Sequence, residues 1–213
     1  MRATVAGLTH NARMLKILTS GLVDAVVVVG TTAPAEASPL VDKGDRHGDV
    51  QIVGDTEGVD PAVVASVDLR HVTVTRLRDG VRVVIRLKEV LPAGRWVQEV
   101  GLSVEGPGWV GPTWMFFVNA FPQHPQSAGA FFLDVTTEGD DGPEDEGDGK
   151  FCRVAVKTGD RVVRLDVPER CLPDEAGELS VSSALLDKRA KEDPLIAQDD
   201  LAFGQPVDLQ PDS

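Results

Sequence analysis

Short segments in which apolar and polar residues alternate recur along the middle of the chain, separated by Gly, Pro and Asp. Because successive side chains of a β-strand point to opposite faces of a sheet, this alternation predicts strands with one buried face. The clearest lies at 81–90, and Asp79-Gly80 predicts a hairpin turn that joins it to a strand at 72–77. Many short strands with turn residues between them are typical of an all-β fold, an antiparallel β-sandwich of jelly-roll or immunoglobulin-like type.

The alternation changes phase once, between Val67-Leu69 and Val72-Val74, where the apolar residues switch from odd to even positions. A regular strand cannot follow this switch without turning its buried face outward. We therefore predict a β-bulge or a break near Arg70-His71.

Further strands are predicted downstream. Residues 96–104 are apolar on one face, whereas 113–121 and 130–135 are apolar on both faces, which favours central strands. The remaining predicted strands are 152–157 and 163–167, which form a second hairpin, and 179–183, which is the last.

These patterns divide the chain into four regions. We predict a signal peptide at 1–37, a flexible lead-in at 38–49, the β-sandwich domain at 50–186 and a polar C-terminal tail at 187–213. The lead-in and the tail are polar, contain Pro and show no regular period, which is typical of segments outside a packed core.

Export is predicted from the first of these regions. Basic residues precede an apolar stretch, and Ala35-Glu36-Ala37 supplies the small residues that a signal peptidase requires before its cut. Translation from Met14 instead of Met1 gives a shorter leader with the same cut. A membrane span needs roughly 20 apolar residues, more than the clean run here, so we expect a secreted protein without stable membrane insertion.

Size and charge limit the classes of partner. The chain has 213 residues and a formal net charge of −13, and removal of the leader leaves 213 − 37 = 176 residues, enough for one ordinary domain. The leader has three basic and two acidic residues, so the mature part carries about −13 − 1 = −14. Such a surface repels phosphate backbones, which disfavours nucleic acid and leaves an extracellular ligand or protein as the expected partner.

Cys152 and Cys171 are the only two cysteines. An even pair in an exported chain predicts a disulfide, and Cys171 lies close to the base of the second predicted hairpin if the chain curls back after Pro168. A catalytic thiol is the alternative, but the sequence around these residues offers no histidine partner for one.

Three pieces of the chain carry a resemblance: Gly48-Asp49-Val50, a valine- and threonine-rich strand pair at 67–90, and Val167-Pro168-Glu169-Arg170-Cys171-Leu172. In this order they resemble exported one-domain β-sandwich proteins of high-GC Gram-positive bacteria, a group without an assigned activity. The resemblance covers most of the mature chain and implies the fold, but it carries over no catalytic residue. The acidic run at 138–149 is more extreme than this pattern.

The acidic run at 138–149 contains many carboxylates with glycines between them. Calcium takes six to eight oxygen ligands, so the run is a candidate for weak Ca²⁺ binding, and no other cofactor is expected. The order of residues does not match an EF-hand loop, and such a run is also typical of a solvated loop. The candidate ligands are Asp140, Asp141, Glu144, Asp145 and Asp148.

Trp109 follows Gly106-Pro107-Gly108 in a predicted loop and is the candidate ligand-binding aromatic residue, because an exposed ring can stack on a sugar. Trp96 and Trp114 lie in strand patterns and are expected in the core.

No catalytic motif is apparent in the sequence. We therefore expect an exported, non-catalytic binding or structural module, with a carbohydrate or a cell-envelope component among the possible ligands. The alternative is a secreted hydrolase with a site built from scattered residues such as Asp68, His71 and His124.

Overall fold

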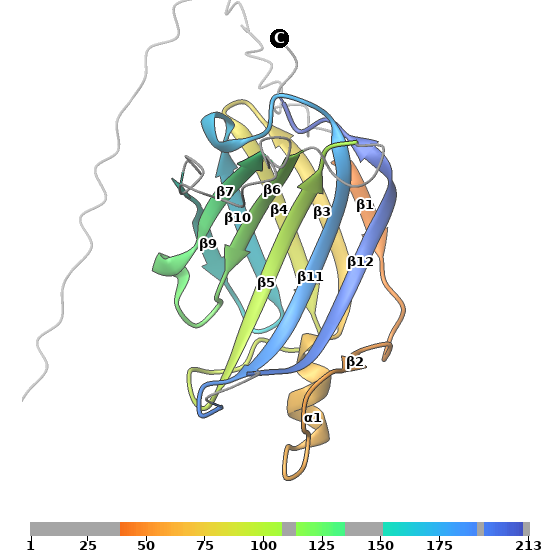
Figure 1. The fold of residues 1–213 in the computed structure, drawn as a ribbon, viewed down its shortest axis with the longest axis vertical. Helices are drawn as coiled ribbons and strands as arrows, with labels where there is room; N and C mark the ends of the chain where they lie inside the picture. The colour runs from red at the N-terminus through yellow and green to blue at the C-terminus, as the bar shows by residue number, and fades with distance from the viewer. Residues whose placement is uncertain (1–38, 108–113, 135–150, 191–193, 211–213) are drawn as a thin grey trace, which may run out of the picture. The chain divides into compact units, whose positions relative to one another are not determined.

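Two antiparallel sheets packed together make up the part of the chain that the structure describes (Figure 1). The structure is a computed structural model, and it describes residues 39–107, 114–134, 151–190 and 194–210. All of them belong to the unit Glu36–Ser213. The predicted signal peptide at 1–37 lies outside the described residues.

The first sheet has five strands. In spatial order they are β1 (Pro39–Gly44), β3 (Leu69–Leu77), β4 (Gly80–Leu87), β10 (Val162–Pro168) and β9 (Ala155–Thr158).

The second sheet has seven strands. In spatial order they are β2 (Gln51–Ile52), β12 (Leu195–Val207), β11 (Gly177–Asp187), β5 (Trp96–Glu105), β6 (Trp114–Ala120), β7 (Gly129–Asp134) and β8 (Cys152–Arg153). The helical pieces are short: α1 (Pro61–Val64) and the 3₁₀ turns η1 (Ala65–Val67), η2 (Pro125–Ser127) and η3 (Glu169–Cys171).

The core lies between the sheets and follows the predicted alternation. From the five-stranded sheet, Val83 and Ile85 are fully buried, and from the seven-stranded sheet Val100 and Phe116 face them with almost no exposed surface. Burying a side chain of this size stabilises the fold by roughly 1.5–3 kcal/mol. The prediction of an antiparallel β-sandwich with one disulfide is confirmed.

The first predicted hairpin and its bulge are also confirmed. Strands β3 and β4 pair from Leu77 opposite Gly80 onward, and the register shifts between Leu69 and His71. Gly80 has a φ of 150°, and a Cβ atom there would lie 2.1 Å from the carbonyl oxygen of Val167. The turn therefore requires glycine at this position.

The second hairpin is present as β9 and β10. The two segments that are apolar on both faces, 113–121 and 130–135, were both predicted as central strands, but their surroundings differ. Strand β6 is central, between β5 and β7, as predicted. On its other side in the sheet, β7 pairs only with the two-residue β8, and Phe131 and Phe132 remain 41% and 39% exposed. Trp114 lies in the core and stacks on Phe132, but Trp96 is only half-buried.

The segment 38–49 is not a flexible lead-in. Its residues 39–44 form β1, which pairs with β3, and Leu40 and Val41 pack partly against the core. The physical reason is that β3 would otherwise expose an unpaired edge of backbone N–H and C=O groups.

The segment 187–213 is likewise not a polar tail. It contains the thirteen-residue β12, which pairs with β11 along most of its length, and Leu201 is buried. The strand pattern is hard to recognise in the sequence because Asp199, an acidic residue, occupies one of its inward positions.

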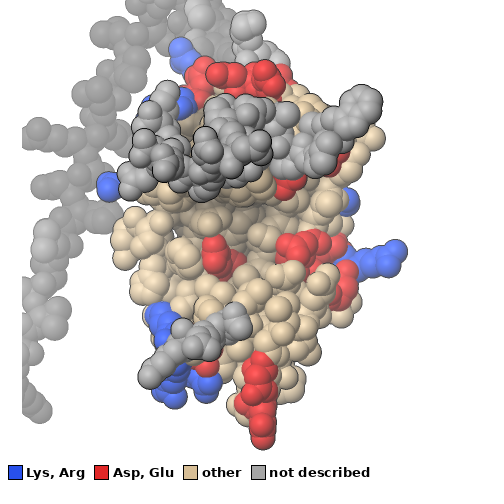
Figure 2. All heavy atoms as spheres, viewed as in Figure 1, with Lys and Arg blue, Asp and Glu red and all other residues tan. Residues whose placement is uncertain are grey.

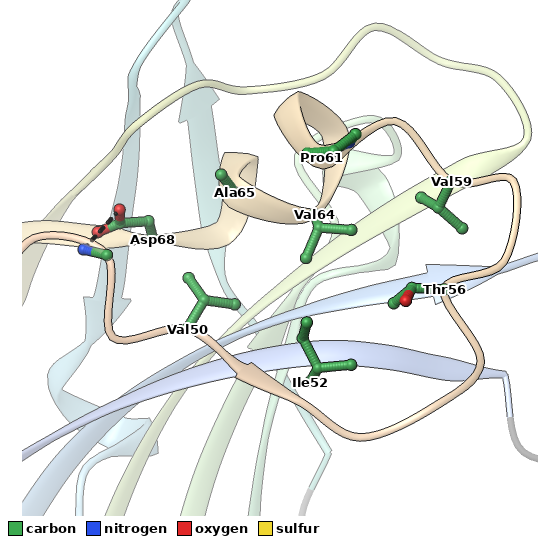
Figure 3. Close-up of a pocket in the computed structure, with 9 residues that line it drawn as sticks. Val50, Ile52, Thr56, Val59, Pro61, Val64, Ala65 and Asp68 are labelled. Carbon is green, nitrogen blue, oxygen red and sulfur yellow. Dashed lines mark hydrogen bonds between the residues drawn. The ribbon is translucent and has the colours of Figure 1, made fainter.

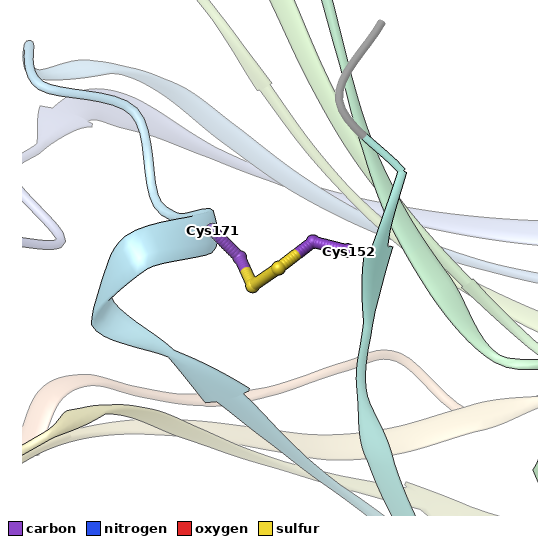
Figure 4. Close-up of a disulfide and its surroundings, with 2 residues drawn as sticks. All are labelled: Cys152 and Cys171. Carbon is purple, nitrogen blue, oxygen red and sulfur yellow. A yellow bond between two sulfur atoms is a disulfide. The ribbon is translucent and has the colours of Figure 1, made fainter.

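The disulfide joins the two sheets at one edge of the sandwich. Cys152 lies in β8 of the seven-stranded sheet, and Cys171 lies in η3, directly after β10 of the five-stranded sheet (Figure 4). Their Cα atoms are 5.8 Å apart. The bond holds the sheets together where the chain passes from β8 to β9.

Replacing both cysteines, Cys152→Ala with Cys171→Ala, should lower the free energy of unfolding by about 3 kcal/mol, because the unfolded chain regains the entropy of a loop closed over a sequence separation of 19. Urea unfolding of the wild type and the double variant, each with and without reductant, measures the effect. Reductant should destabilise only the wild type. Equal stabilities of the oxidised wild type and the double variant would contradict this role.

Candidate carboxylate site at one end of the sandwich

Two aspartates near the start of the described chain meet a third from near its end, at the end of the sandwich near β2. Asp45 follows β1, Asp49 precedes β2, and Asp199 lies in β12. One carboxylate oxygen from each lies within 4.8 Å of the others. Asp68 lies next to this group, at the junction of η1 and β3. We refer to Asp45, Asp49, Asp68 and Asp199 as the carboxylate cluster.

Hydrogen bonds from the backbone fix the cluster. The amide of Leu69 donates to Oδ2 of Asp199 at 2.7 Å, which joins the start of β3 in one sheet to β12 in the other. The amide of Gly48 donates to Oδ2 of Asp68 at 3.0 Å, and the amide of Asp45 donates to the carbonyl of Arg70 at 3.2 Å. The segment 45–49 is thereby held against the start of β3.

Two residues of the cluster are buried, and within the described residues the cluster is incompletely hydrogen-bonded. Asp68 and Asp199 are 1% and 3% exposed. Within the described residues, Oδ1 of Asp68 and Oδ2 of Asp45 are buried and accept no hydrogen bond. A buried acceptor without a partner costs roughly 1–3 kcal/mol, and more when it is charged. Both atoms therefore lack the interaction that would offset their burial.

Repulsion within the cluster shifts its titration. Burial, together with the negative charges of Asp45, Asp49 and Asp68, raises the pKa of Asp199 to about 6, although the hydrogen bond from Leu69 acts in the opposite direction. Burial also raises the pKa of Asp45, again with Asp49 and Asp68 as repulsive neighbours. The one described ion pair to the cluster joins Nη2 of Arg70 to Oδ2 of Asp68 at 2.7 Å.

The arrangement fits a hard cation. Two oxygens that bind one Ca²⁺ at about 2.4 Å each can lie at most about 4.8 Å apart, which matches the separations in the cluster. An all-oxygen, all-carboxylate donor set favours Ca²⁺ or Mg²⁺ over the softer transition metals. Asp45, Asp49 and Asp199 are the residues that could hold such an ion, and Asp68 lies beside them as a further negative charge.

A hollow of about 310 Å³ adjoins the cluster (Figure 3). Its walls are largely aliphatic, from the stretch around β2 and from α1, and Figure 3 shows Val50, Ile52, Val59 and Val64 around the space with Asp68 at one end. Gly48 and Asp68 line the hollow and also share a hydrogen bond at the cluster. The hollow can receive an apolar group beside a charged one.

The residues predicted from the sequence lie elsewhere. Trp109 and the predicted calcium ligands, Asp140, Asp141, Glu144, Asp145 and Asp148, lie outside the described residues. The carboxylate cluster was not predicted, although one signal for it exists: Asp68 interrupts an otherwise apolar stretch.

The three residues of the hydrolase alternative have separate partners. Asp68 binds Arg70, His71 binds Asp42, and Nε2 of His124 lies 3.3 Å from Nζ of Lys188. No hydrogen bond or ion pair joins any two of the three in the part of the chain that the structure describes.

Among the described residues, no helix is long and apolar enough to cross a membrane. Comparison with known proteins adds no relative: no protein-family model matches the chain, and no curated protein and no solved structure matches it either.

Proposed function

We propose that this chain is an exported, non-catalytic β-sandwich module that binds a calcium-class cation at the carboxylate cluster and an extracellular ligand beside it. The observation that carries the proposal is the group of mutually repelling carboxylates, in which Oδ2 of Asp45 and the neighbouring Oδ1 of Asp68 are buried and accept no hydrogen bond from any described residue. A cation supplies both the missing partner and the missing positive charge.

The cation has a structural consequence in this proposal. It bridges Asp199, in the seven-stranded sheet, to the segment 45–49, which leaves the five-stranded sheet. Because it binds the folded chain and not the unfolded one, it stabilises the sandwich by mass action. Extracellular modules bind Ca²⁺ with dissociation constants on the order of 10⁻⁴–10⁻³ M, and we expect this range.

The ligand is placed in the hollow beside the cluster. Since Gly48 and Asp68 line the hollow, and Asp68 also belongs to the cluster, a bound cation fixes one wall of the hollow. The aliphatic lining favours a ligand with an apolar face or chain, such as a cell-envelope component or the apolar face of a carbohydrate. Export is supported by the leader at 1–37 and by the disulfide, which is typical of oxidising compartments.

Calcium titration tests the cation site. The protein freed of metal with chelator should bind one Ca²⁺, measured by calorimetry, and its melting temperature should rise with Ca²⁺ concentration. Asp49→Asn should weaken binding at least tenfold, because it removes the charge of one proposed ligand. The variant should still fold, since Asp49 is exposed and its replacement leaves the core intact. Asp79→Asn, which removes the same charge in the turn between β3 and β4, should bind like the wild type. Equal affinity of all three proteins would overturn the proposal.

The stability of the metal-free protein should depend on pH through Asp199. Its pKa of about 6 in the folded chain lies above the value of about 3.9 for an unfolded aspartate, so between these values only the folded state holds the proton. Stability should therefore rise as pH falls through 6 and be lost as pH rises through 6. The lowered pKa values of Asp166 and Asp187 act below pH 4, outside this window.

Thermal unfolding between pH 5 and pH 8 in chelator measures this dependence. In Asp199→Asn the amide oxygen still accepts the hydrogen bond from Leu69, so the variant should fold and lose this component of the pH dependence. Saturating Ca²⁺ should stabilise the wild type most above pH 6, where the carboxylates are charged. A wild type and variant with the same pH profile would show that Asp199 does not titrate in this range.

A further inference from the structure

A basic hollow lies beside the carboxylate cluster, on a chain whose net charge is −13. It has a volume of about 520 Å³. Apart from Leu87, every residue that lines it is basic: His47, Arg70, Arg86, Lys88 and Arg161. Such a concentration of basic residues is not expected by chance in a protein with this excess of acidic residues.

Backbone hydrogen bonds bring the basic residues together from separate elements. At the end of β4, the amide of Leu87 donates to the carbonyl of Arg161 at 3.0 Å, which joins this end to the turn before β10. The amide of Lys88 donates to the carbonyl of Asp68 at 2.8 Å, which joins it to the start of β3. The positions of these side chains are therefore set by the sheet and its turns.

Most of these cations have no anionic partner. Arg86, Lys88 and Arg161 are exposed and form no ion pair with any described residue, whereas Arg70 is paired with Asp68. Elsewhere on the same sheet Arg82 and Arg164 share the carboxylate of Asp166, at 2.8 Å and 2.6 Å. On the same sheet, therefore, Arg82 and Arg164 are paired with a carboxylate, whereas the exposed cations around the hollow are paired with no described residue.

We propose that this hollow is an oxyanion site that takes the phosphate group of a phosphate monoester. Guanidinium groups bind phosphate oxygens through paired N–H donors, and a lysine adds a point charge. Three unpaired cations around one hollow match the charge of a phosphate monoester near neutral pH. An extended polyanion fits less well, because the rest of the acidic surface repels it.

The two proposed sites share no residue, although the ion pair between Asp68 and Arg70 lies between them. None of its unpaired cations belongs to the carboxylate cluster, and the basic hollow keeps its charge whether or not the cluster binds Ca²⁺. Failure of phosphate binding therefore leaves the calcium proposal standing, and failure of calcium binding leaves this one standing.

Binding of inorganic phosphate and of glycerol 1-phosphate to the full chain, followed by ³¹P NMR and calorimetry in chelator, tests the proposal. We expect one site, with affinity that falls as salt rises. The double variant Arg86→Gln with Arg161→Gln should bind at least tenfold more weakly, and Arg86→Lys should lie between it and the wild type. Arg78→Gln, an exposed arginine in the turn at the other end of the β3–β4 hairpin, is the matched control and should bind like the wild type.

A glycerol-phosphate polymer added in a parallel arm distinguishes the source of the phosphate group. Tighter binding of glycerol 1-phosphate supports the proposed monoester site, whereas tighter binding of the polymer, whose repeats are phosphate diesters, would contradict it. Equal affinity of the wild type and the double variant would overturn it, as would equal weakening by Arg78→Gln, which would show only a response to net charge. The replaced side chains are exposed, and unchanged melting temperatures confirm that the variants fold.

Discussion

A sandwich of two sheets has to be held together at both of its edges, and this chain uses different means at each. At one edge Cys152 and Cys171 join the sheets covalently. At the other, Asp199 of β12 reaches across to accept the amide hydrogen of Leu69. This second contact places a carboxylate where the sheets meet, and the other acidic residues of the cluster surround it. A charge in a buried position is unfavourable, and the proposed cation site follows from this constraint.

Most strands could be predicted because their inward residues are apolar, as at Val81, Val83 and Ile85, and a change of phase was enough to locate the bulge at Leu69–His71. Strand β12 was missed because Asp199 faces inward and breaks the alternation. Strand β1 was missed because it is an edge strand, and edge strands commonly carry Pro and charged residues that hide their period.

The candidate site could not be predicted for a related reason. Its residues come from segments as much as 199 − 45 = 154 positions apart, the separation of Asp45 and Asp199, and only the folded topology brings them together. The densest acidic run in the sequence, at 138–149, attracted the calcium prediction instead. Aspartates at inward strand positions, such as Asp199, are the weaker but more informative signal, because a buried charge requires a partner.

Charge is distributed unevenly between the two layers. Strands β5, β11 and β12 contain acidic residues but neither Lys nor Arg, and Figure 2 shows acidic residues over the middle of this face with basic ones at its margins. Arg82, Arg86 and Arg164 lie on the five-stranded sheet. The domain therefore has an electric dipole across its layers, which orients it relative to a charged surface before any contact forms.

The ion pair between Asp68 and Arg70 lies between two regions of opposite charge, since Asp68 belongs to the carboxylate cluster and Arg70 lines the basic hollow. A cation that draws electron density from Asp68 weakens its hold on Arg70 and frees the guanidinium toward the hollow. By thermodynamic reciprocity, an anion that engages Arg70 releases Asp68 toward the cation to the same degree. If both proposed sites bind their ions, this one short salt bridge couples them, so that each of two oppositely charged solutes favours the binding of the other.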